Sequence, residues 1–138
     1  MSNTCKDRVE YELQKEIENL TILWESYCKG EEETKELGSL YDYGLSFDYV
    51  EPGTFEGQRE GYFRYQLSYG GPSDEFRFYA DKTHNSWSLY RVEYWFLDWF
   101  DGASITLSGE KLDLLSEIFN SFFAEISCDY AYEEALKP

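Results

Sequence analysis

The chain has 138 residues, of which 28 are Asp or Glu and 12 are Lys or Arg, giving a formal net charge of −16. This charge excludes direct binding to nucleic acids or to anionic membranes, because both need a basic surface that neutralises phosphates. A hydrophobic fraction of 42% and an aromatic fraction of 20% exclude an acidic disordered tail. We therefore expect one folded domain over residues 1–138.

The cysteines and the N-terminal residues indicate the compartment. Cys5, Cys28 and Cys128 cannot all pair within one chain, and their spacing matches neither a CxxC redox motif nor a zinc site. We expect reduced thiols. The first residues contain no apolar stretch typical of a signal peptide, and no run approaches the roughly 18 apolar residues that span a bilayer. The sequence therefore predicts a cytoplasmic protein.

A long amphipathic helix is expected between about Lys6 and Lys29. Its apolar residues recur at steps of three and four, as one stripe of a helix requires, and Gly30 ends the pattern. The acidic stretch from Glu31 to Glu36 follows, and the period then changes to two. The residues of the stripe are Val9, Leu13, Ile17, Leu20, Trp24 and Tyr27.

Four strands with short connections are expected in the middle of the chain. Residues of alternating character predict half-buried strands, and turn signals such as Pro52-Gly53 and Gly70-Gly71-Pro72-Ser73 separate them. Such an order predicts an antiparallel meander. The expected strands are Tyr43–Val50, Tyr62–Tyr69, Glu75–Asp81 and Trp87–Trp99.

The last of these strands carries large side chains on both faces. The pattern predicts one face with Tyr90, Val92, Tyr94 and Phe96, and another with Leu89, Arg91, Glu93, Trp95 and Leu97. Such a strand is expected inside the sheet and not at its edge. Trp95 and Phe96 are then structural residues, not ligand-stacking aromatics.

A second amphipathic helix is expected after the sheet. Asp101-Gly102 is interpreted as the exit from the sheet, and Ser108 as the N-cap. Leu112, Leu115, Phe119, Phe122 and Ile126 share one face of this helix. The predicted fold is α+β: a four-stranded antiparallel meander flanked by an N-terminal and a C-terminal helix packed on one face.

The acidity is distributed along the whole chain. The net charge is −5 over residues 1–40, −6 over 41–107 and −5 over 108–138. This distribution excludes an acidic tail and predicts a negative potential over much of the folded surface.

Two interpretations of this acidity stay open. The acidic side chains can serve solubility alone, or they can imitate the phosphates of DNA and bind a basic protein surface. Tyr11 and Ile22 lie close to the acidic residues of the first helix and would suit a partner that is basic and apolar. The candidate partner-binding residues are Asp7, Glu10, Glu18, Glu25, Glu31, Glu32, Glu33, Glu36, Glu110, Asp113 and Glu117.

No motif in the sequence identifies a reaction. His84 is the single histidine and falls in a turn, without a partner at the spacing of a triad or metal site. Glu93, Asp98 and Asp101 could form an acid/base pair or a cation site, but such proximity is expected by chance among 28 acids. We expect no catalytic residues, no cofactor and no metal.

The arginines suggest an alternative site. Arg64, Arg77 and Arg91 fall in the middle of strands, where their planar groups can pack against aromatic rings or pair with carboxylates such as Asp48 and Glu93. The favoured interpretation is structural: arginines, carboxylates and aromatic rings alternate as a ladder on the less buried sheet face. The alternative is an anion or small-ligand site there, in a ligand-binding or enzymatic domain.

Residues 37–103 resemble a family of small acidic, aromatic-rich proteins from bacterial plasmids and phages that have no assigned function. The distinctive stretches are Gly-Gly-Pro-Ser-Asp-Glu-Phe at 70–76 and Trp-Phe-Leu-Asp-Trp-Phe-Asp-Gly at 95–102. The resemblance implies counter-defence roles, such as anti-restriction or anti-CRISPR inhibition. Together with the charge, it favours a non-enzymatic inhibitor of a nucleic-acid-handling defence enzyme, such as a nuclease.

Overall fold

A 24-residue helix, α1 (Cys5–Cys28), begins the fold in the computed structural model, which describes residues 4–31 and 33–138. Thr4 caps it: the threonine hydroxyl accepts from the Asp7 amide, and the Asp7 carboxylate accepts from the Thr4 amide at 3.1 Å. This capping box satisfies two amides of the first turn that have no partner inside the helix. Gly30 follows the end of the helix with φ 81°, so the predicted helix is confirmed.

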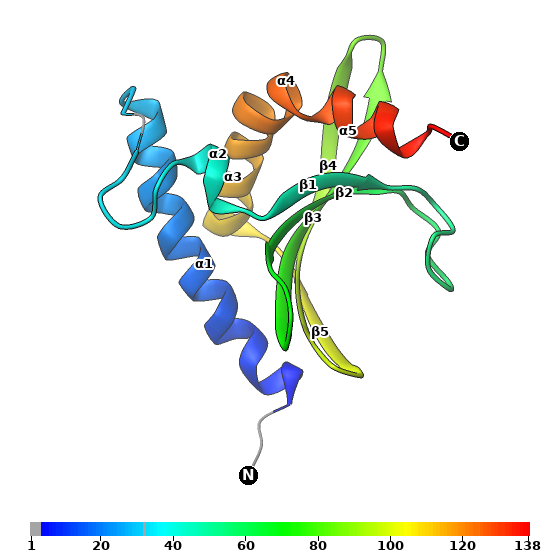
Figure 1. Ribbon diagram of the computed structural model, residues 1–138, viewed down its shortest axis with the longest axis horizontal. Helices are drawn as coiled ribbons and strands as arrows, with labels where there is room; N and C mark the ends of the chain where they lie inside the picture. The colour runs from blue at the N-terminus through cyan, green and yellow to red at the C-terminus, as the bar shows by residue number, and fades with distance from the viewer. Residues whose placement is uncertain (1–3, 32) are drawn as a thin grey trace.

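The sheet is an antiparallel meander of five strands in the order β1-β2-β3-β4-β5, one more than predicted. The helices lie on one of its faces (Figure 1), as expected. None of the described helices is long and apolar enough to cross a bilayer. The strands are β1 (Ser46–Val50), β2 (Tyr62–Ser68), β3 (Pro72–Thr83), β4 (Ser86–Asp98) and β5 (Asp101–Thr106).

The fifth strand begins where the sequence had been interpreted as leaving the sheet. Asp101 pairs with Asp98 and Gly102 with Leu97, so β5 folds back on β4 through a connection of only two residues, Trp99 and Phe100. Trp99 adopts φ 56°, a conformation that Gly or Asn usually supplies in tight hairpins. A turn made by two aromatic residues gives no sequence signal, which is why the strand was missed.

The first strand is shorter than predicted. Ser39 accepts from the Asp42 amide at 3.1 Å and starts a single helical turn, α2 (Leu40–Tyr43), in place of strand residues. Leu45, expected on the core face, is exposed. Phe47 and Tyr49 pack against the core as expected.

A β-bulge in β4 changes which side chains face the helices. Tyr79 pairs with Arg91 and Ala80 with Leu89, so Tyr90 has no partner in the register. The extra residue reverses the alternation: Leu89 packs on the core, while Tyr90 is about half exposed. The predicted faces were therefore wrong for these two residues. They are confirmed for Val92, Tyr94 and Phe96, all buried, and β4 lies between two strands as predicted.

The C-terminal region is helical, with a π-helical turn after α3 and a break at Ser127 before α5. Ser108 occupies the N-cap, as expected, but its side chain makes no capping hydrogen bond. The π-helical turn η1 adds a residue to the repeat, so Phe123 is buried and Ile126, expected in the core, is 52% exposed. The segments are α3 (Gly109–Ile118), η1 (Phe119–Phe123), α4 (Ala124–Ile126) and α5 (Cys128–Ala135).

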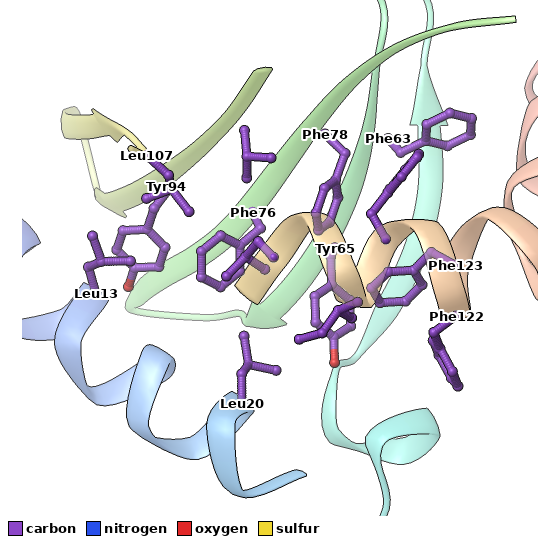
Figure 2. Packing of buried hydrophobic residues seen from close by; sticks show 14 of the residues in the cluster. Leu13, Leu20, Phe63, Tyr65, Phe76, Phe78, Tyr94, Leu107, Phe122 and Phe123 are labelled. Atoms are coloured by element: carbon purple, nitrogen blue, oxygen red, sulfur yellow. The ribbon is translucent and has the colours of Figure 1, made fainter. Parts of the chain in front are cut away.

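Aromatic rings fill the space between the sheet and the helices. Figure 2 shows Phe63 and Phe78 from the sheet facing Phe123 of η1, with Leu13 and Leu20 of α1 completing the layer. Phe78 and Phe119 have ring centroids 5.1 Å apart, and Phe76 and Tyr94 also 5.1 Å. These tilted contacts are favourable beyond the burial of area alone.

Candidate functional site

The ten predicted partner-binding residues that the structure describes are all exposed. The eleventh, Glu32, lies outside the described residues. On α1 and α3 the acidic positions point away from the core, because residues such as Glu18 and Glu117 fall on the helix side opposite the buried stripe. We call these exposed carboxylates the acidic helical surface: Asp7, Glu10, Glu18, Glu25, Glu31, Glu33, Glu36, Glu110, Asp113 and Glu117.

The structure brings the two acidic rows onto neighbouring helices. The Trp24 indole on α1 donates to the Glu117 carboxylate on α3 at 3.2 Å. At the other end, Glu10 of α1 and Lys111 of α3 line one shallow hollow. The sequence predicts which acidic residues share a helix face, but it does not predict that the two helices are neighbours.

Some of these carboxylates also have local partners. Asp7 belongs to the capping box, Glu18 accepts from Gln14 at 3.3 Å, and Glu31 accepts from Ser26 at 3.3 Å. Glu31, Glu33 and Glu36 lie in the segment that follows the end of α1. At about 1.5 Å per residue the helix alone is about 36 Å long, so the surface is long enough to span a nucleic-acid-binding groove.

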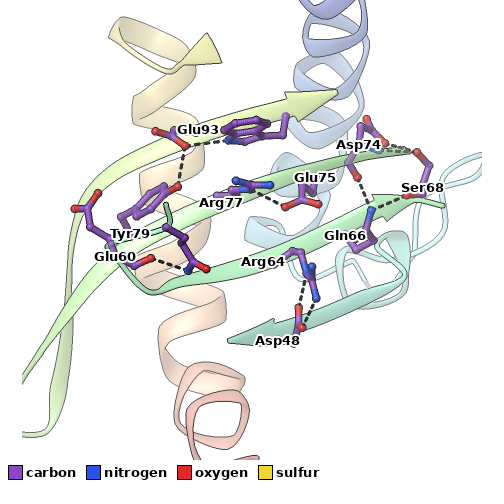
Figure 3. A network of polar contacts seen from close by, with 12 residues as sticks. Asp48, Glu60, Arg64, Gln66, Ser68, Asp74, Glu75, Arg77, Tyr79 and Glu93 are labelled. Atoms are coloured by element: carbon purple, nitrogen blue, oxygen red, sulfur yellow. Dashed lines mark hydrogen bonds and ion pairs between the residues drawn. The ribbon is translucent and has the colours of Figure 1, made fainter. Parts of the chain in front are cut away.

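The uncovered sheet face carries the arginine ladder that the sequence predicted. Figure 3 shows Arg64 of β2 reaching Asp48 of β1 through two hydrogen bonds, 2.7 Å and 3.1 Å long. The Arg77 guanidinium lies 2.8 Å from Glu75 and between two rings, 4.0 Å from the centroid of Trp95 and 4.7 Å from that of Tyr62. The bidentate and stacked geometries are those for which a guanidinium is suited.

Arg91 completes the ladder. It pairs with Glu60 at 2.5 Å and with Glu93 at 3.1 Å, and it lies 4.0 Å from the centroid of Tyr79. Hydrogen bonding to Arg91 lowers the pKa of Glu60 below its usual range. All three arginines therefore have carboxylate partners, as the predicted ladder requires.

The same face contains a hollow of about 520 Å³ beside Arg77, closed on one side by the 55–60 segment. Tyr62, Tyr79 and Trp95 line it, whereas Arg64 and Arg91 do not. Glu60 and Glu93 also line it. An anion entering this hollow would meet Arg59 and the already paired Arg77, but also several carboxylates, which weakens the ligand alternative.

A buried pair of carboxyl groups was missed by the sequence reasoning. Glu16 of α1 lies near Asp74 of β3, under the helix layer; Tyr43 donates to Glu16 at 2.7 Å and Tyr94 donates to Asp74 at 2.7 Å. Burial, and then the Asp74 charge, raise the pKa of Glu16 to about 7. The sequence did indicate that Glu16 faces the core, because at 100° per residue it falls among the core positions of α1.

The other candidate groups have structural roles. Asp98 pairs with Arg8 at 3.4 Å, and Asp101 accepts from the Cys5 amide at 2.8 Å, which lowers the pKa of Asp101. His84 is exposed in the turn between β3 and β4 with φ 55°. Within residues 4–31 and 33–138, no three His, Cys, Asp or Glu side chains group so that they could hold a metal ion.

In comparisons with known proteins, no protein-family model, no curated protein and no solved structure matches this chain.

Proposed function

We propose that this chain is a non-catalytic binding protein that docks its acidic helical surface on a basic protein surface and thereby inhibits a nucleic-acid-handling enzyme. The observation that carries the proposal is that α1 and α3 are neighbouring helices and that their acidic residues are exposed. A basic groove that binds phosphates attracts such a surface by the same electrostatics.

The arrangement of the remaining charges supports this proposal. The sheet arginines are paired internally with Asp48, Glu60, Glu75 and Glu93, so they present little free positive charge.

Carboxylates seven residues apart on α1, such as Glu18 and Glu25, are about 10 Å apart along its axis. This spacing is wider than that of DNA phosphates, so α3 must contribute charges to approach the density of a duplex.

The resemblance to small acidic proteins of plasmids and phages suggests which enzymes are inhibited. In that setting the partner is a restriction or CRISPR nuclease, and the proposed role is anti-restriction or anti-CRISPR inhibition in the bacterial cytoplasm. A basic surface on another nucleic-acid-binding protein would attract the acidic helical surface in the same way.

A second candidate function is small-ligand binding in the hollow beside Arg77. The observation favouring it is the aromatic lining by Tyr62, Tyr79 and Trp95. We rank it second because the faces of these rings are already in contact with Arg77 or Arg91.

A paired charge-reversal experiment tests the first function. The protein is immobilised and used to capture partners from a bacterial lysate at low and high salt, and the captured proteins are identified. Glu18→Lys with Glu25→Lys changes the acidic helical surface. Glu56→Lys with Glu51→Lys makes the same change in net charge on the segment that follows β1, away from α1 and α3.

The proposal expects a nucleic-acid-binding enzyme among the captured proteins, lost at high salt because exposed charges are screened. The helix double variant should lose about 90% of it, while the control double variant should lose less than half. Equal losses in both variants would show that net charge alone matters. Capture of only salt-insensitive partners that do not bind nucleic acid would reject the proposal.

A further inference from the structure

An apolar groove runs across the end of the molecule where α1 finishes. It consists of two hollows, of about 330 Å³ and 520 Å³, that share Tyr41 and Phe122 as lining residues. The first is bounded by the end of α1, the 30–39 segment and α2. The second lies between the start of β1 and the η1 to α5 region. Distant parts of the chain therefore converge on one concave surface.

Several large apolar side chains that line this groove are exposed to solvent. Tyr41 is 71% exposed, Leu45 62% and Tyr130 69%, and Tyr27 and Ile126 are also exposed. The ring of Tyr27 packs edge-on against Phe122, with centroids 5.2 Å apart. Single exposed apolar residues need no explanation, but a contiguous set around a hollow is typical of an interaction site.

A buried hydroxyl at the floor of the second hollow also lacks a partner. Tyr65 is 3% exposed and lines this hollow, yet its hydroxyl has no hydrogen-bond partner of good geometry among the described residues. Its ring lies against Gly44, where a Cβ atom would come within 2.1 Å of it. The Gly44 amide lies close to this hydroxyl and the oxygen is closed off from solvent, so the exposed apolar side chains around the hollow, and not this hydroxyl, indicate a bound partner.

The rim of the groove is acidic. Glu31 and Glu33 line the first hollow, and the exposed Asp42 and Glu125 are next to Tyr41 and Ile126 in the sequence. Lys29 and Lys35 offset part of this charge. Because the whole chain carries −16, a second copy or an anionic membrane would be repelled, whereas a segment with Lys or Arg beside its apolar side chains would be attracted.

We propose that this groove binds a basic amphipathic segment of a partner protein, whose apolar side chains fill the two hollows and whose basic side chains meet the acidic rim. This site shares Glu31 and Glu33 with the acidic helical surface but is centred on the apolar hollows at the end of α1, and it does not depend on inhibition of a nucleic-acid-handling enzyme. The binding mode is that of an amphipathic helix in a groove.

A model peptide tests the proposal without knowledge of the natural partner. The probe is a fluorescein-labelled helical peptide of about 18 leucines and lysines, with leucines at the i, i+3, i+4 and i+7 positions. Binding to the full-length protein is measured by fluorescence anisotropy at constant ionic strength. A matched peptide with glutamate in place of lysine is expected not to bind.

The decisive variants add negative charge inside the groove. Tyr41→Asp and Ile126→Asp should each weaken binding of the basic peptide about tenfold, because a desolvated charge would replace apolar contact. Non-specific attraction to an acidic protein predicts the opposite sign, since each variant is more negative. Tyr11→Asp, at a 67% exposed position on the outer side of α1, is the control and should change the affinity less than twofold.

Other outcomes would overturn the proposal. Unchanged or tighter binding by the folded groove variants, verified by unchanged melting temperatures, would assign peptide binding to net charge. Wild-type dimerisation in sedimentation that Tyr41→Asp abolishes would assign the groove to a second copy. Binding to phosphatidylcholine vesicles that the same variant abolishes would assign it to lipid. Loss of peptide binding in Glu18→Lys with Glu25→Lys, but not in Tyr41→Asp, would place the peptide on the acidic helical surface instead.

Discussion

The two faces of the sheet accommodate charge in opposite ways. On the uncovered face, Arg64, Arg77 and Arg91 each have a carboxylate partner, and Arg77 also lies between the rings of Tyr62 and Trp95. On the covered face, Glu16 and Asp74 are neighbours of like charge, and tyrosine hydroxyls are their hydrogen-bond donors. The first arrangement stabilises ionised groups, while the second favours a protonated carboxyl group.

This difference follows from the small number of bases in the chain. With 12 Lys and Arg against 28 Asp and Glu, most carboxylates cannot have a basic partner. The carboxylates of the uncovered face pair with the arginines, and the acidic residues on the outer side of α1 and α3 remain in water. Asp74, which is buried, and Glu16, which is partly buried, lie on the covered face and accept hydrogen bonds from tyrosines. The acidic helical surface is thus the part of the molecule where negative charge is left free to attract a partner.

Removing an aromatic ring from the covered face should have the largest effect on stability. Phe96 is buried, and Phe96→Ala should lower the free energy of unfolding by about 4 kcal/mol through lost burial and an unfilled cavity. Phe100→Ala, at a fully exposed position four residues away, should change it by less than about 0.5 kcal/mol. Urea unfolding measures both, and equal values would mean that β4 is not part of the core.

Breaking the ladder on the uncovered face should have the next largest effect. Arg77→Met leaves the Glu75 carboxylate, which is buried, without its partner, and should cost about 3 kcal/mol. Arg64→Met removes a more exposed pair and should cost less than about 1 kcal/mol.

The matching double variant separates charge from packing. Adding Glu75→Gln to Arg77→Met should restore more than half of the lost stability, because no buried charge is then left unpaired. If the double variant is as unstable as Arg77→Met, the arginine acts through its contacts with Trp95 and Tyr62 and not through its charge.

The Glu16 carboxyl should make stability depend on pH. Its pKa is raised to about 7 in the folded protein and is about 4.3 when unfolded. Between these values the folded state holds a proton that the unfolded state has released, so stability falls as pH rises through this window. Glu16→Gln should be about 2 kcal/mol more stable than the wild type at pH 8 and equal to it at pH 4.

Denaturant unfolding of both proteins across this pH range measures that difference. Because the other carboxylates are common to both proteins, the difference between the two free energies of unfolding, followed against pH, reports the replacement of Glu16. A difference that does not vary with pH would contradict the buried carboxyl pair.

The smallest effect is expected at the β4–β5 turn. Trp99 is 86% exposed with φ 56°, so Trp99→Gly should relieve backbone strain and raise the free energy of unfolding by about 0.5 kcal/mol. A loss of stability in urea unfolding would show instead that the indole packs against the neighbouring hairpin.

Much of the fold could be predicted because apolar residues recur in the sequence at the regular spacing of a helix or a strand. The stripe of α1 and the alternation around Phe63, Phe76 and Tyr94 identified the helix, four strands and the covered face. The fifth strand, the bulge at Tyr90 and the π-turn at Phe119–Phe123 could not be predicted. Each is an insertion or turn that local sequence does not signal, and each shifts the phase of the residues that follow.

The candidate site was predictable to a similar extent. Exposure of the acidic residues, and contacts of the mid-strand arginines with carboxylates or aromatic rings, followed from their positions on a helix or strand. The adjacency of α1 and α3, the meeting of Glu16 with Asp74 and the groove around Tyr41 depend on tertiary packing. A sequence without aligned relatives contains no direct record of such contacts.

The comparison of captured partners between two equally charged variants tests the central claim most directly. Glu18→Lys with Glu25→Lys and Glu51→Lys with Glu56→Lys differ only in where the reversed charges lie. If the acidic helical surface binds the partner, the first pair should lose about 90% of the captured nucleic-acid-binding enzyme and the second less than half. Equal capture by both pairs would contradict the account, because capture would then not depend on the acidic helical surface.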